Sequence, residues 1–128
     1  MRHMAIVGFI IWAAATAGLR IGGQYVFRET STRAAVLLLL VSLPVMVIVA
    51  LQVLRRYRTA EERALAAIVL VAPGMALDTI SSMWFSRVFP NIRADAAGLF
   101  GGWLLFCNVI VLLTAIVSSR SAIAVDRG

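Results

Sequence analysis

Residues 64–85 read ALAAIVLVAPGMALDTISSMWF, and this stretch decides the fold. It is long enough to cross the hydrocarbon core of a bilayer, which takes about 20 apolar residues. It contains Asp78, the only acidic residue inside any apolar run of the chain. A charged carboxylate at the centre of a bilayer costs roughly 2.5–3.5 kcal/mol, so it normally faces the protein interior and has a partner. We therefore expect a transmembrane helix with one inward-facing acid.

Three further apolar runs accompany this stretch, at residues 4–27, 34–54 and 96–117. Of the 128 residues, 62% are hydrophobic, well above the roughly 45–50% of an average soluble domain. The mean hydropathy of +0.95 points the same way. We predict a single transmembrane domain over residues 1–128. Its fold class is an all-α, integral-membrane four-helix bundle of up-down topology, with both termini on the same side.

The charged and metal-binding residues exclude several classes of function. The formal net charge is +6, but the arginines flank the apolar runs as topology signals do, so we expect no nucleic-acid binding. Cys107 is the only cysteine and His3 the only histidine. One chain therefore lacks the ligands of a haem, zinc or di-iron site. We expect no metal and no cofactor, and we expect no catalysis because no catalytic constellation is present.

The arginines also predict an orientation in the membrane. Their densest cluster, Arg55, Arg56 and Arg58, lies in the connection between the second and third runs. With four spans, this connection is on the same side as both termini. Short loops rich in arginine stay in the cytoplasm. We therefore predict that both termini are cytoplasmic.

Local signals mark the starts of two helices and the middle of a third. Thr59 followed by Glu62 is a capping-box pattern in front of the third run. A hydroxyl residue among residues 30–32 can cap the second run. Pro73 and Gly74 are expected to loosen the third run in its middle, because proline removes a backbone hydrogen bond.

A polar face predicts the candidate functional residues. Gly74, Asp78 and Ser81 recur at helical spacing and share one side of the third run. Arg20 interrupts the first run at a similar depth, so it can pair with Asp78 or extend its head group to the lipid surface. Asn108 lies near the middle of the fourth run, where its amide is expected to bond to a neighbouring helix.

Glycines predict where helices approach each other. Gly18 and Gly22 form one GxxxG pattern, and Gly98 and Gly102 form a second that Gly101 widens. Such patterns let another helix pack closely, from this chain, from a second copy or from another membrane protein. The alternative is that glycine is simply common in membrane helices. Besides the lipid bilayer, the partners expected are therefore a homo-oligomer or a membrane protein that binds through the GxxxG faces.

Two functions are compatible with Asp78. In the first, the acid is structural: it fixes how the helices dock in a protein of structural or accessory type. In the second, it exchanges a proton for a cationic substrate, as in a small proton-coupled transporter. Small four-helix multidrug exporters also work around one membrane carboxylate, but their acid is a glutamate in the first helix, where this chain has Arg20. The structural function is the leading expectation, and transport is the alternative.

The second half of the chain resembles a known family. The resemblance rests on APGM at residues 72–75, Asp78, FPN at 89–91, AAGLFG at 96–101 and WLL at 103–105. Together these motifs are similar to a family of small bacterial four-span membrane proteins of unknown function. The resemblance implies four spans and a location in the bacterial plasma membrane, and it implies no activity.

Overall fold

The computed structural model describes residues 1–28 and 30–126, with side chains as far as Arg120. The described residues form helices and the connections between them, without strands, and four of the helices are long and apolar enough to cross a membrane. The predicted all-α class with four spans is therefore confirmed. The elements are α1 (Arg2–Val26), α2 (Thr32–Leu54), α3 (Ala60–Met83), the short α4 (Phe85–Val88), the 3-10 helix η1 (Ala94–Ala96) and α5 (Ala97–Asp126).

Hydrogen-bonding side chains set the starts of α2 and α3. The capping box in front of α3 forms: Glu62 N donates to Thr59 Oγ1 at 3.2 Å, and Thr59 N donates to Glu62 Oε2 at 3.4 Å. At α2, Ser31 Oγ accepts from Ala34 N at 3.2 Å. Both helices thus begin ahead of the predicted residues 34 and 64, because the cap and not the first apolar residue starts a helix.

Two helices run on where the sequence predicted an end or a weak point. α5 continues past the predicted residue 117 to Asp126, and within this extension Ser119 Oγ donates to the Ala115 carbonyl at 2.6 Å. α3 continues through Pro73, so the expected loosening is not a break in the helix. Neighbouring helices compensate for an interior proline in a membrane bundle.

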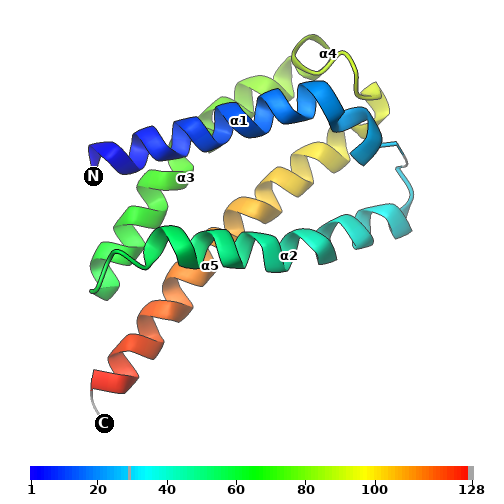
Figure 1. Cartoon of the computed structure of the whole chain (residues 1–128). Coiled ribbons are helices and arrows are strands. Elements are labelled where there is room, and N and C mark those ends of the chain that lie inside the picture. The colour runs from blue at the N-terminus through cyan, green and yellow to red at the C-terminus, as the bar shows by residue number, and fades with distance from the viewer. Residues whose placement is uncertain (29, 127–128) are drawn as a thin grey trace.

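The four long helices run up and down, and both termini lie at the same end of the molecule (Figure 1). α3 and α5 pack against each other at the centre, α1 packs on α3, and α2 packs on α5. The chain order of the helices is therefore not their order in space. The first and second helices flank a central pair made of the third and the last.

Small side chains form the core at the end that holds the termini. We call it the alanine core, because Ala50, Ala66, Ala67 and Ala115 are all at most 1% exposed. Here a Cβ atom at Gly8 would collide with the carbonyl oxygen of Leu70, so α1 and α3 approach backbone to backbone. The alanine core consists of Met4, Ala50, Leu54, Ala66, Ala67, Leu70, Val71, Val111 and Ala115.

Aromatic rings form the core at the opposite end. In this aromatic core, Phe100 lies at the centre, with ring centroids 4.8 Å from Phe89, 5.1 Å from Phe85 and 5.5 Å from Phe27. The rings join the connections at this end to the start of α5. The aromatic core consists of Phe27, Phe85, Phe89, Ile92, Ala96 and Phe100.

Candidate functional site

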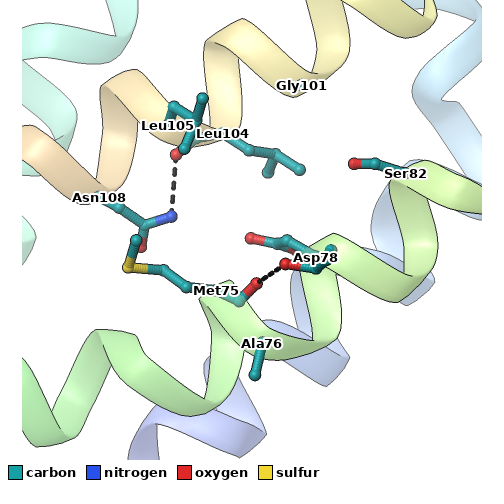
Figure 2. A pocket seen from close by; sticks show the side chains of 9 residues that line it. Met75, Ala76, Asp78, Ser82, Gly101, Leu104, Leu105 and Asn108 are labelled. Atoms are coloured by element: carbon teal, nitrogen blue, oxygen red, sulfur yellow. Dashed lines mark hydrogen bonds between the residues drawn. The ribbon is translucent and has the colours of Figure 1, made fainter.

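A cavity of about 490 Å³ lies between α3 and α5 (Figure 2). On both helices its lining residues lie between those of the alanine core and those of the aromatic core. The two cores hold the helices together at both ends. Between them, Gly101 contributes no side chain, and the position of a Cβ atom there has open space around it. The cavity is lined by Met75, Ala76, Asp78, Thr79 and Ser82 of α3 and by Gly101, Leu104, Leu105 and Asn108 of α5.

Asp78 is half-buried, and its carboxylate points into the space between the two helices (Figure 2). Trp12 Nε1 donates a hydrogen bond to Asp78 Oδ1 at 2.9 Å. The Asn108 amide also interacts with the carboxylate, and it donates to the Leu104 carbonyl at 2.9 Å. The acid thus has neutral donors on two sides and keeps part of its surface open to the cavity.

Trp12 is a residue of the candidate site that the sequence did not predict. One face of α1 packs on the rest of the chain: Met4 and Gly8 are buried, and Trp12 lies a further four residues on, half-buried. The Trp12 ring contacts the Cβ position of Gly74, with Cδ1 at 3.7 Å, so Gly74 gives the indole room beside α3. The signal was the four-residue spacing from Gly8, combined with an indole N–H that needs an acceptor in apolar surroundings.

Of the two alternatives predicted for Arg20, the pair with Asp78 does not form among the described residues. Arg20 is exposed, and within the described residues the side chain that donates to the carboxylate from α1 is Trp12. The packed face of α1 continues from Trp12 to Leu19, which contacts the aromatic core. Arg20 is turned by about 100° from Leu19, because each helical residue advances by that angle. Its position along α1 places Arg20 at a depth similar to that of Asp78, but this position does not determine which way the side chain points.

The serine that lies beside Asp78 at the cavity is Ser82 and not the predicted Ser81. Ser81 is only 4% exposed, so it is buried as predicted, but it does not line the cavity. Ser82 does line it, and its hydroxyl points toward the same space as the Asp78 carboxylate (Figure 2). Thr79 also lines the cavity, and its hydroxyl donates to the Met75 carbonyl at 3.0 Å.

The GxxxG glycines do not mediate contacts between the helices of this chain. In the described part, no atom outside the local helix lies within 4 Å of the Cβ position at any of five glycines, so this prediction is wrong for intrachain packing. The close approaches occur instead at Gly8, beside Leu70, and at Gly23, where Ile92 Cδ1 would be 2.5 Å from an added Cβ. The five open positions are Gly18, Gly22, Gly98, Gly101 and Gly102.

The charges of the site limit what it can bind. Among the described residues, no three His, Cys, Asp or Glu side chains gather to hold a metal ion. The ion pair found among them, Arg93 with Asp95 at 2.6 Å, lies in the exposed connection before α5, away from the cavity. In the described lining, Asp78 is the one charged side chain that can face an occupant.

Comparison with known proteins places most of the chain in one family. A family model described as a family of unknown function (DUF5367) matches residues 26–122. No curated protein and no solved structure matches the chain. The matched region contains every residue that lines the cavity, whereas Trp12 on α1 lies outside it.

Proposed function

Because this chain belongs to the DUF5367 family, whose function is unknown, we propose a function from the cavity: exchange of a proton for a cationic compound at Asp78, in a small membrane transporter. The observation that supports this proposal most is the setting of the carboxylate. It faces a cavity of about 490 Å³, and a tryptophan N–H, not an arginine, approaches it from α1. A purely structural acid would be expected to lie against Arg20, away from any cavity.

Proton movement is coupled to cation movement because the proton and the cation compete for the one negative charge of Asp78. A carboxylate inside a membrane protein is stabilised either by a proton or by a cation beside it, and the cost of leaving it bare is high. If the same carboxylate accepts both, binding of the cation releases the proton. The neutral Trp12 and Asn108 donors orient the carboxylate without supplying a competing positive charge. The proposal includes no covalent step and hence no enzymatic activity.

Proton movement in liposomes tests the proposal. The purified protein is reconstituted with a pH-sensitive dye inside the vesicles, and ammonium, methylammonium and tetraphenylphosphonium are added in turn outside. We expect at least one cation to drive proton release above the level of protein-free vesicles. Asp78→Asn should abolish this release, and Asp95→Asn, at the exposed ion pair outside the cavity, should retain it. No proton release with any cation, or equal release by Asp78→Asn, would disprove exchange at this residue.

A structural function is the second candidate, and one contact favours it. The Trp12–Asp78 bond joins α1 to α3, so the acid also helps to dock the first helix. If this were its whole role, wild-type vesicles would show no cation-driven proton release. Asp78→Leu and Trp12→Phe would then lower the unfolding temperature by similar amounts, since each removes the same bond.

An accessory role in an assembly is supported by the open glycines. Gly98 and Gly102 have free space around them within the described residues, so α5 offers a smooth surface to a second copy or to another membrane protein. Gly98→Leu or Gly102→Leu should then weaken co-purification or self-association in mild detergent. An unchanged assembly state in both variants would count against this role.

The proposed location is the bacterial plasma membrane, with both termini in the cytoplasm. It is supported by four helices of spanning length and by the arginines at positions 55, 56 and 58 in the connection from α2 to α3. Reporter fusions at each terminus test the orientation. A reporter that is active only outside the cytoplasm should be inactive at both ends.

A further inference from the structure

The size of the cavity indicates an organic ligand. Its volume of about 490 Å³ lies inside the range of roughly 300–1,000 Å³ that is typical of small-molecule pockets. A hard metal cation needs about six or more oxygen ligands at contact distance. The described lining offers one carboxylate, and no three acidic, histidine or cysteine side chains gather there. The space is thus too large, and the charge of one carboxylate too small, for a bare divalent cation.

The charge of the lining indicates that the ligand carries a single positive charge. Asp78 is the one charged side chain among the residues that line the cavity. A second positive charge on the ligand would have no counter-charge there, and an unpaired charge at membrane depth is expensive. An anion would face the carboxylate directly. The cavity therefore suits a monovalent cation.

The walls indicate that the rest of the ligand is apolar. Met75 of α3 and Leu104 of α5 extend into the space between the two helices, on either side of Asp78 (Figure 2). Ala76 and Leu105 also line the cavity, and its polar groups besides Asp78 are those of Thr79, Ser82 and Asn108. Methionine is flexible and fills irregular gaps, so this wall adapts to ligands of different shape. We infer that the cavity binds lipophilic organic cations with one positive charge. This inference names the substrate class of the proposed exchange function and rests on it.

Two ions of matched shape test the inference by calorimetry on the detergent-purified protein. Tetraphenylphosphonium and tetraphenylborate have nearly the same size and surface but opposite charge. The wild-type protein should bind the phosphonium and not the borate. Asp78→Asn should weaken phosphonium binding by at least about tenfold, which is 1.4 kcal/mol. Equal binding of both ions, or no phosphonium binding, would overturn the inference.

A pair of glycine variants tests whether the ion lies in the cavity. Gly101→Leu places a side chain in open space at the cavity wall and leaves Asp78 untouched, so it should weaken phosphonium binding by at least about tenfold. Gly22→Leu is the matched control: the glycine lies on α1, has the same open surroundings and does not line the cavity. It should bind the phosphonium like the wild type. Equal losses in both variants would place the ion elsewhere and overturn the inference.

A variant on the opposite wall covers the case in which Gly101→Leu does not fold. Ser82→Leu narrows the cavity from the exposed side of α3 and should weaken phosphonium binding in the same way. A folded Ser82→Leu protein with wild-type binding would contradict the inference.

Failure of the inference is distinguishable from failure of the proposed function. Proton release driven by methylammonium with no phosphonium binding keeps the function and overturns the substrate class. Phosphonium binding without any proton release overturns the exchange function and keeps the ligand.

Discussion

The two halves of α3 pack against α5 in opposite ways. In the first half, Ala66, Ala67 and Leu70 are buried in the alanine core, and the adjacent face of α1 approaches closely enough that Gly8 admits no side chain. In the second half, Asp78 and Ser82 line a cavity, although the helix continues without interruption. The difference shows how a small membrane protein leaves an open pocket between two packed regions. Tight contacts are placed at the ends of the central helix pair, and the polar residues are placed between them.

Gly8→Leu should lower stability the most, because Gly8 lies where α1 and the first half of α3 approach each other most closely. The leucine side chain would collide with the backbone carbonyl of Leu70, which cannot move without displacing α3. We expect α1 to detach from α3, with a loss of more than about 3 kcal/mol, at the upper end of the usual overpacking range. Thermal unfolding in detergent measures it. The control is Gly18→Leu on the same helix, where the space is open and stability should not change.

Phe100→Ala should have the next largest effect, because it empties the centre of the aromatic core. The Phe100 ring contacts Phe27, Phe85 and Phe89, so its removal leaves a cavity in the aromatic core. In soluble proteins such a change costs about 3–5 kcal/mol. We expect about 2 kcal/mol here, because lipid solvates apolar surface as well as the protein does. Phe9→Ala, at a half-exposed ring, is the control and should be close to neutral in the same unfolding assay.

Trp12→Phe tests the second half of α3, which lines the cavity, and should lower stability by less than Phe100→Ala. It keeps the aromatic ring and removes the N–H that donates to Asp78 Oδ1. Losing a hydrogen bond to a charged group costs about 1.5–3 kcal/mol when the group stays buried. The cost should be smaller here, because Asp78 keeps its interaction with the Asn108 amide and is partly open to the cavity. Phosphonium affinity should change together with stability, since the carboxylate loses its orienting partner. Trp84→Phe, at an exposed indole beyond α3, should change neither quantity.

Thr59→Ala should have the smallest effect. It removes the hydroxyl that accepts from Glu62 N at the start of α3, outside both cores. Loss of such a cap costs about 1 kcal/mol. Circular dichroism during thermal unfolding should show a small decrease in the unfolding temperature and normal phosphonium binding. Thr30→Ala is the control, because Ser31 and not Thr30 caps α2. A larger loss of stability in Thr59→Ala than in Trp12→Phe would contradict this prediction, because the cap would then stabilise more than the start of α3.

Residues close in the sequence were predicted well because their signals are local. The capping box at Thr59 and Glu62 depends on residues three apart, and the structure has it. Hydropathy over about 20 residues likewise identified all four long helices. Errors of a few residues arose where an apolar run was taken as the boundary of a helix. Capping side chains decide where α2 and α3 begin.

The direction in which each helix faces was predicted poorly. Arg20 was placed at about the depth of Asp78, yet it points outward while Leu19 continues the packed face. The GxxxG patterns predicted close approach, yet Gly8, outside both patterns, is the glycine that meets another backbone. One residue of rotation changes which side chains point inward. Small residues occur on both lipid-facing and packed sides of membrane helices, so their spacing alone does not distinguish the two.

The sequence by itself determined the number and length of the spans and the presence of one acid among them, because the cost of placing polar groups in hydrocarbon depends only on local composition. Only the tertiary structure decided that Trp12 and Asn108 surround this acid and that space remains beside it. Those contacts join residues far apart in the chain, and they depend on how α1, α3 and α5 are rotated when the alanine and aromatic cores form.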